Sequence, residues 1–194
     1  YLELDTRNLV RFKDDSDFEG EDMTPRVELI GDNSLTKTLY CRQLCGQWHK
    51  EKLEAFRDLL ESTEDRLIVF YNFNEELTRL RKICESLNRE VSFVNGSGRS
   101  MYAYECVDNS VTFVQYQAGA MGGNYQKANK IVYFTLPLGK GSCDLWEQSK
   151  KRIHRIGQNR PCYYYYLLVK GSFEERNLTA LREGKELTDE LFEK

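Results

Sequence analysis

The sequence predicts an α/β fold in which a parallel sheet is covered by helices on both faces. Segments of β-rich apolar residues alternate with segments of helical periodicity from residue 67 onward. The run LIVFY at 67–71 is apolar throughout, as expected of a strand buried on both faces. Strands and helices that alternate at this spacing form a parallel sheet with right-handed crossovers. We therefore expect three layers, with the sheet between two layers of helices.

The first 32 residues carry the weakest signals, and we expect an irregular or hairpin segment there. LVRFK and RVELI are expected to be short strands that flank the acidic run KDDSDFEGED. One domain is expected over 33–194, because the chain has enough apolar material for a single core. Asn33 or Ser34 can cap its first helix, and a second helix follows with an apolar stripe at positions 53, 56, 59 and 60.

The central part of the chain supplies most of the predicted sheet. Asn74 is expected to cap a helix that has Glu75 and Glu76 in its first turn, where the helix dipole favours acidic groups. The turn NGSG at 95–98 separates two of the later segments. Further strands are predicted near 91–94, 111–116, 130–134 and 162–169.

Two helices complete the C-terminal part. One is expected over 142–155, between the strands near 130–134 and 162–169. The other begins at Ser172, because Ser172 and Glu175 match the S-x-x-E capping box.

Composition indicates an ordinary soluble protein, and we expect a cytoplasmic location. No run of 18 or more apolar residues occurs, and the opening YLELDTRNLV lacks the pattern of a signal peptide. The net charge of −3 conceals a basic cluster at 150–160, which can bind phosphate. Tyr1 in place of an initiator Met indicates a segment of a longer polypeptide.

The six cysteines show no CxxC pairing. Cys41, Cys45 and His49 are spaced by four, so on a helix they would share one face and could ligate a metal. Structural zinc requires four ligands, however, and Gly46 interrupts the stretch. We therefore interpret the cysteines as core residues and expect no metal site.

Ligands of open parallel sheets bind outside the carboxyl ends of the strands, so chemistry is expected in the loops there. QAGAMGGN at 117–124 follows a strand directly and holds three glycines. Its lack of bulk would let backbone N–H groups approach a phosphate. A glycine-rich turn is also a common tight connection, and the glycines alone leave both readings open.

The segment QSKKRIHRIGQNRP at 148–161 is the most informative one. On the predicted helix, Gln148, Arg152 and Arg155 are spaced by four and three and share a face. Grouped guanidinium groups can stabilise the charge on a transferring phosphoryl group, as an arginine finger does. A solvated basic face explains the spacing equally well.

RIHRIGQ, preceded by Gln148 and followed by a strand and GSFEE, resembles motif VI of Swi/Snf-type members of helicase superfamily two. CRQLCG, KLEAFRDLL and RLIVFYNF resemble the entry into the second recombinase-A-like (RecA-like) lobe of that family. QAGAMGGN falls where the glycine-rich motif V belongs. The resemblance covers roughly 35–187 and implies the C-terminal lobe of a two-lobed, ATP-driven translocase on double-stranded DNA, with 1–32 coming from the inter-lobe region.

By this resemblance, Arg152 and Arg155 reach toward an ATP bound by the other lobe, and Gln148 contributes to the same interface. The expected nucleotide-coupling residues are Gly119, Gly122, Asn124 and Gln158. The expected contacts with the DNA backbone are Asn72, Asn95, Gly96, Ser97 and Gln117, although ordinary turn chemistry also accounts for 95–97.

The chain departs from the family at several positions. Ala120 stands where a second glycine is usual, Gly123 and Tyr125 stand where leucines are common, and Trp-Asn-Pro is missing from LPLGKGSCDLWEQ. These differences resemble bacterial or phage-type relatives.

Neither a GxxxxGK[ST] phosphate loop nor an Asp-Glu-x-His motif occurs in the sequence. The resemblance therefore implies that ATP and Mg²⁺ are held mainly by an N-terminal lobe of the same polypeptide. Two alternatives stay open: a non-catalytic nucleic-acid-binding module with a degenerate helicase fold, and a lobe of an RNA helicase. We expect no membrane partner.

Overall fold

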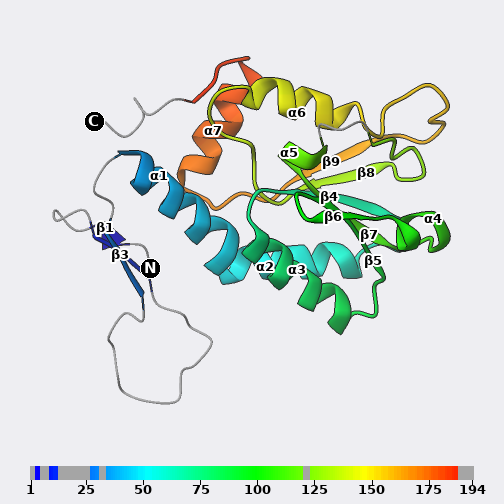
Figure 1. Cartoon of the computed structure of the whole chain (residues 1–194), viewed down its shortest axis with the longest axis horizontal. Coiled ribbons are helices and arrows are strands. Elements are labelled where there is room, and N and C mark those ends of the chain that lie inside the picture. Colours follow the sequence, from blue (N-terminus) through cyan, green and yellow to red (C-terminus); the bar gives the residue numbers. More distant parts are fainter. Residues whose placement is uncertain (1–2, 5–8, 13–26, 31–33, 120–122, 188–194) are drawn as a thin grey trace.

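The computed structural model describes residues 3–4, 9–12, 27–30, 34–119 and 123–187. A six-stranded sheet with the order β6-β5-β7-β4-β8-β9 lies between helices on its two faces (Figure 1). All neighbouring strands run parallel except β6, which pairs antiparallel with β5. The predicted three-layer α/β fold is therefore confirmed.

The strands of this sheet are β4 (Leu67–Tyr71), β5 (Val91–Asn95), β6 (Gly98–Ser100), β7 (Val111–Gln115), β8 (Lys130–Tyr133) and β9 (Tyr163–Tyr166). The helices are α1 (Ser34–Gln43), α2 (Lys50–Glu61), α3 (Asn74–Ser86), α4 (Tyr102–Cys106), α5 (Tyr116–Gly119), α6 (Ser142–Lys150) and α7 (Phe173–Arg182). A π-helical segment, η2 (Leu44–Trp48), continues α1.

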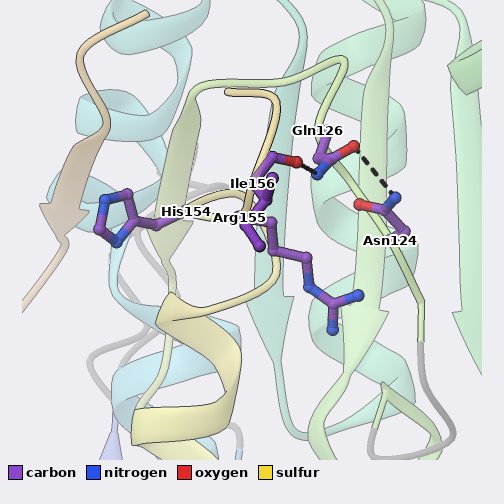
Figure 2. A pocket seen from close by; sticks show the side chains of 5 residues that line it. All are labelled: Asn124, Gln126, His154, Arg155 and Ile156. Carbon is purple, nitrogen blue, oxygen red and sulfur yellow. Dashed lines mark hydrogen bonds between the residues drawn. The ribbon is translucent and has the colours of Figure 1, made fainter. Parts of the chain in front are cut away.

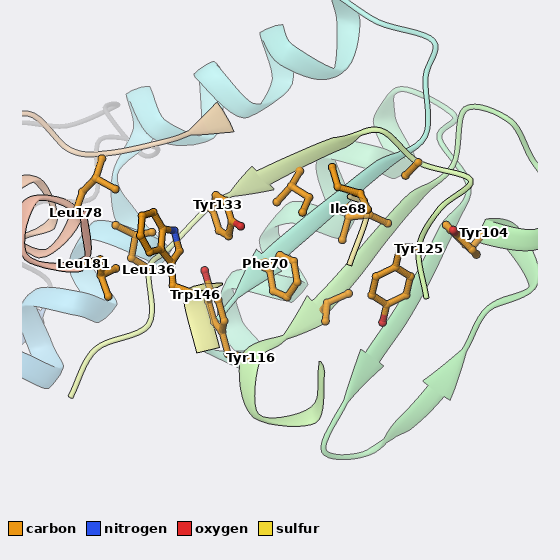
Figure 3. Close-up of a cluster of buried hydrophobic side chains, with 14 residues drawn as sticks. Ile68, Phe70, Tyr104, Tyr116, Tyr125, Tyr133, Leu136, Trp146, Leu178 and Leu181 are labelled. Atoms are coloured by element: carbon orange, nitrogen blue, oxygen red, sulfur yellow. The ribbon is translucent and has the colours of Figure 1, made fainter. Parts of the chain in front are cut away.

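The central strand β4 divides the core into two halves, because successive side chains of a strand point to opposite faces. Ile68 and Phe70 join a cluster with side chains from α4, α6 and α7 (Figure 3). Leu67, Val69 and Tyr71 join a second cluster with side chains from α2 and α3. All five β4 residues are buried, as the uninterrupted apolar run predicts.

The N-terminal strands form a separate three-stranded antiparallel sheet of β1 (Glu3–Leu4), β2 (Leu9–Phe12) and β3 (Val27–Ile30). The strands expected at LVRFK and RVELI are β2 and β3, which pair antiparallel with Leu9 opposite Ile30. The acidic run at 13–22 lies outside the described residues. In the described part of the chain, no helix is long and apolar enough to cross a membrane.

Two helix starts differ in detail from the prediction. The residue before α3 is Phe73, so Asn74 is the first helical residue and not the cap; the Glu76 carboxylate accepts a hydrogen bond from the Phe73 N–H at 3.2 Å. Ser172 does cap α7, since its hydroxyl accepts from the Glu174 N–H at 3.1 Å. Glu175 accepts from the Gly171 N–H and not from that of Ser172, so the capping box is incomplete.

The face expected for Cys41, Cys45 and His49 does not form on one α-helix. α1 gives way to the π-helical segment before Cys45, and His49 follows that segment in an extended conformation. Burial of Cys45 raises the pKa of its thiol to about 12, as expected of a core cysteine. No group of three His, Cys, Asp or Glu side chains among the described residues is arranged to hold a metal ion.

Candidate functional site

The loop between α6 and β9 carries Arg152 and Arg155. The helix predicted to run to residue 155 ends at Lys150, so the proposed sharing of one helical face by Gln148 and these arginines is wrong. The Arg152 carbonyl accepts from the Tyr125 N–H at 3.0 Å, and the Ile153 side chain is fully buried in the core. These contacts with distant residues are incompatible with a continued helix. They could not be predicted from the helical periodicity of the sequence.

This loop lies at the amino ends of the strands, because it leads into β9, whose first residue Tyr163 is level with Lys130 at the start of β8. The Asn129 side chain donates to the Pro161 carbonyl at 2.9 Å and ties the end of the loop to the same edge. We expected chemistry at the carboxyl ends. The arginines lie at the opposite edge, since a crossover helix returns the chain there before the next parallel strand.

An open hollow lies between this loop and the segment that begins at Asn124, the last residue of the glycine-rich motif. Its lining is formed by Asn124, Gln126, His154, Arg155 and Ile156 (Figure 2). The structure therefore brings together Asn124 and Arg155, which are 31 positions apart in the sequence and were assigned to different motifs.

The guanidinium group of Arg155 is suited to bind an anion. Its Nε donates to the Lys151 carbonyl at 3.0 Å, which fixes the stem of the side chain. The N–H groups on Nη1 and Nη2 make no hydrogen bond or ion pair with any residue that the structure describes. Arg155 is exposed, so these donors are accessible to a phosphate, whose oxygens match the planar fork of an arginine.

The other two predicted catalytic residues lie apart from the hollow lining. Arg152 is only 9% exposed. Burial raises the pKa of the neighbouring Tyr125, and the charges of Arg99 and Arg152 oppose the shift. Gln148 lies on α6 and is exposed. Their roles at an interface with another lobe stay predictions.

Gln158 was predicted to contact the nucleotide, but its amide group is engaged within the chain. Its Nε2 donates to the carbonyls of Gln126 at 3.1 Å and Ala128 at 2.9 Å, and its Oε1 accepts from the Arg160 N–H at 3.2 Å. The side chain is thus a connection between two loop segments, and direct contact with a nucleotide stays untested.

The glycine-rich motif is only partly visible. Gly119 ends α5, and Gly122 lies outside the described residues. Gly123 is buried against Tyr125, and a Cβ there would lie 2.4 Å from the phenol oxygen. A Cβ at 123 would therefore force the buried Tyr125 ring to move, whereas relatives of the resembled family commonly have leucine at this position.

The five predicted DNA contacts lie at the carboxyl ends of β4, β5 and β7, on the edge opposite the arginines. The Asn72 Nδ2 donates to Thr135 Oγ1 at 2.9 Å and to the Leu136 carbonyl at 3.0 Å, which ties the ends of β4 and β8 together. Gln117 is exposed. Contact of either side chain with DNA stays a prediction.

The turn after β5 is held by local hydrogen bonds. Asn95 Oδ1 accepts from the Ser97 N–H at 3.0 Å and from its hydroxyl at 2.7 Å, and the Gly96 N–H donates to Gln115 Oε1 at 3.3 Å. This is the turn chemistry that the sequence left open as an alternative to DNA binding.

Sequence reasoning missed a buried carboxylate at this edge. Glu76 is fully buried, and its Oε2 accepts from the Asn72 and Phe73 N–H groups and from the Thr135 hydroxyl. Its Oε1 has no partner among the described residues and lies against Gly46. Burial raises the pKa of Glu76 above its ordinary value, although the three hydrogen bonds oppose the shift.

Replacement of Glu76 by Gln is expected to change how stability depends on pH. A carboxyl group whose pKa is raised on folding stabilises the folded state in its protonated form, and this contribution is lost as pH rises through the folded pKa. The free energy of unfolding of Glu76→Gln, relative to wild type, should therefore increase between pH 4 and pH 8 in urea titrations. Glu75→Gln, an exposed neighbour, is the control. A constant difference over this range would contradict the raised pKa.

The hollow also contains residues that the sequence did not single out. Gln126 lies two positions after the expected end of motif V, and His154 and Ile156 lie inside RIHRIGQ without an assigned role. Ile156 is fully exposed, which is unusual for a large apolar side chain. No local pattern predicts that Gln126 faces this loop, because the contact joins segments about 30 residues apart.

Comparison with known proteins finds similar sequences among ATP-dependent helicases and DNA repair proteins. No family model matches the chain. It is 27% identical over 143 residues, 69% of its length, to the ATP-dependent helicase fft1 of Schizosaccharomyces pombe. It is 28% identical over 137 residues, 66% of its length, to a DNA repair and recombination protein RAD54-like of Danio rerio. The chain spans less than a fifth of the length of these relatives.

Two solved structures share the fold. The C-terminal part of the Fun30 ATPase domain matches with a TM-score of 0.59 at 20% identity, covering 71% of this chain and 46% of that one. The C-terminal domain of the DEAD-box protein Dbp5 matches with a TM-score of 0.57 at 18% identity, covering 72% of this chain and 81% of that one. The fold is therefore that of a RecA-like helicase C-terminal lobe.

The similar sequences named above come from a yeast and a fish. They give no support to the bacterial or phage-type origin expected from the departures in motif V. One of those departures, Gly123, is packed against the Tyr125 ring in this chain.

Proposed function

We propose that this chain is the C-terminal lobe of an ATP-dependent motor that translocates on double-stranded DNA. In this proposal, residues 33–194 form the lobe and residues 1–32 come from the region between the lobes. ATP and Mg²⁺ are held mainly by an N-terminal lobe of the same polypeptide. The observation that carries the proposal is that the Nη1 and Nη2 donors of Arg155 have no partner among the described residues and lie at an open hollow, on the loop that resembles motif VI.

Arg155 supplies charge to the transition state of ATP hydrolysis. A phosphoryl group in transfer carries negative charge on its oxygens, and an arginine from a second lobe stabilises that charge. Arg152 and Gln148 contribute to the same interface between the lobes. ATP binding then draws the lobes together, and hydrolysis removes this contact and lets them separate.

The opposite edge of the sheet is proposed to contact the DNA backbone. The proposed contacts lie at the carboxyl edge of the sheet, where parallel sheets commonly bind ligands: Asn72, Asn95, Gly96, Ser97 and Gln117. Contacts with phosphates carry no sequence information, which suits a motor that steps along any DNA. Such binding weakens steeply as salt increases, because it releases counterions.

ATP hydrolysis by the full-length polypeptide and by this chain alone tests the proposal. We expect the full-length polypeptide to hydrolyse ATP and duplex DNA to stimulate it. The chain alone is expected to show no measurable hydrolysis, since it lacks a phosphate loop. Stimulation by RNA and not by duplex DNA would favour an RNA helicase. DNA binding without any hydrolysis would favour a non-catalytic binding module.

A further inference from the structure

The 151–162 loop is largely exposed, yet it is held at many points to the segment 124–129. Only Arg152 and Ile153 of the loop are buried, so side-chain packing fixes its beginning and not its tip. Gly157, with a φ of +99°, adopts a left-handed turn immediately after Ile156. The conformation of the tip, which includes Arg155, must therefore depend on hydrogen bonds.

Two glutamines, one on the segment 124–129 and one on the loop, make several of these hydrogen bonds. Gln126 lies on the segment 124–129, and its Nε2 donates to the Ile156 carbonyl in the loop at 2.5 Å (Figure 2). Gln158 reaches back from the loop, and its Nε2 donates to the carbonyls of Gln126 and Ala128. Each side chain thus binds the backbone of the segment that carries the other.

The side chain of Gln126 also lines the hollow. Gln126 Oε1 accepts from Asn124 Nδ2 at 3.2 Å, so Gln126 connects Asn124 to the carbonyl next to Arg155. The backbone N–H of Gln158 donates to the Arg155 carbonyl at 3.0 Å and closes the turn at the tip. Asn124 and Arg155, which the sequence had predicted as site residues, are therefore each hydrogen-bonded to one of the two glutamines.

We propose that Gln126 and Gln158 form a reciprocal clasp that positions Arg155 for phosphate. The clasp itself is a structural claim about this chain, and its effect on ATP turnover rests on the proposed function. Gln158 is accordingly a positioning residue and not a nucleotide ligand, because its amide group is already committed to carbonyls and to the Arg160 N–H.

Limited proteolysis of the chain tests the clasp without reference to ATP. Trypsin cuts after Lys and Arg, and the loop offers Lys151, Arg152 and Arg155. Replacement of Gln158 by Met keeps the length of the side chain and removes its hydrogen bonds. We expect cleavage in the loop to accelerate about tenfold, because cleavage follows the population of the opened loop. Gln126→Met, which removes fewer bonds, should accelerate it several-fold.

Asn159→Ala is the matched control. Asn159 is an exposed amide in the same loop, and its side chain makes no hydrogen bond with a described residue. The Asn159→Ala variant should be cleaved in the loop at the wild-type rate. Cleavage of Gln158→Met at the wild-type rate would overturn the clasp, whatever the ATP assay shows.

A double-mutant cycle in the full-length polypeptide separates positioning from a general loss of structure. Gln158→Met should lower kcat about tenfold when Arg155 is present and should cause no further loss when Arg155 is replaced by Ala. Equal losses in both backgrounds would show that Gln158 does not act through Arg155 and would overturn the positioning role. Full activity of Arg155→Ala would overturn the proposed function, and the proteolysis result would still decide the clasp.

Discussion

Replacement of Arg155 by Ala should lower ATP turnover by the full-length polypeptide about 10³-fold or more, the scale of a lost arginine finger. This corresponds to about 4 kcal/mol of transition-state stabilisation. The structural reason is that the Nη1 and Nη2 donors of Arg155 are exposed and unpartnered among the described residues, while its Nε is anchored on the Lys151 carbonyl. Steady-state hydrolysis in the presence of duplex DNA measures the effect.

The kinetic pattern distinguishes catalysis from binding. A contact made chiefly in the transition state lowers kcat with little change in KM. Arg155→Lys should recover only part of the activity, because an ammonium group lacks the bidentate fork of a guanidinium. Lys151→Ala is the control, since it removes an exposed cation from the same loop and leaves the carbonyl that anchors Arg155. Full activity of Arg155→Ala would show that Arg155 has no role in ATP hydrolysis.

The second large effect is expected on stability, from a buried ion pair at the carboxyl edge of the sheet. Lys52 on α2 and Glu174 on α7 approach to 2.6 Å, and both side chains are almost completely buried. Glu174 also accepts from the Val169 N–H at 2.9 Å, and the Lys52 ammonium lies over the Phe134 ring. The pair therefore joins helices from the two opposite faces of the sheet.

Either single replacement, Lys52→Met or Glu174→Gln, should lower the free energy of unfolding by about 3–5 kcal/mol, because it leaves a buried group without its partner. Replacement of both residues by Met should cost less than the sum, since neither charge then remains buried. Urea denaturation of the chain measures these differences.

The exposed ion pair of Lys185 and Glu183 provides the control. Its atoms approach to 2.7 Å, a distance similar to that of the buried pair, but the side chains are 73% and 52% exposed. Lys185→Met should change the free energy of unfolding little, because solvent screens an exposed ion pair. Similar losses for the buried and the exposed replacements would contradict the importance of burial.

The sheet could be predicted because its signals are local. The apolar run of β4 and the alternation of strands and helices depend on residues that are close together in the sequence, and the structure contains both. The N-terminal hairpin was also predictable from two short β-rich runs.

The end of α6 could not be predicted in this way. Helical spacing continues past Lys150 in the sequence, and the helix ends because Tyr125 binds the Arg152 carbonyl and because Ile153 enters the core. The placement of the predicted site residues at two opposite edges of the sheet likewise depends on the tertiary structure. The sequence identified Arg155 and Asn72 as candidates, but only the topology places them at opposite ends of the strands.

The distant partners of several residues could not be predicted from the sequence. The sequence marks Glu76 as an acidic residue of a first helical turn, whereas it is buried beneath Gly46 and bound to Thr135, 59 positions away. Gln158 was assigned to the nucleotide from its place in RIHRIGQ, and its hydrogen bonds reach Gln126 and Ala128. Such contacts depend on tertiary packing and leave no periodic signal.

Photo-crosslinking with an ATP analogue that carries a reactive group on its γ-phosphate tests the central claim most directly. In the full-length polypeptide, the account predicts an adduct, mapped by mass spectrometry, within residues 151–160, and excess ATP should suppress it. Adducts that form only elsewhere, in a polypeptide that hydrolyses ATP, would contradict the claim that this loop meets a triphosphate held by a neighbouring lobe.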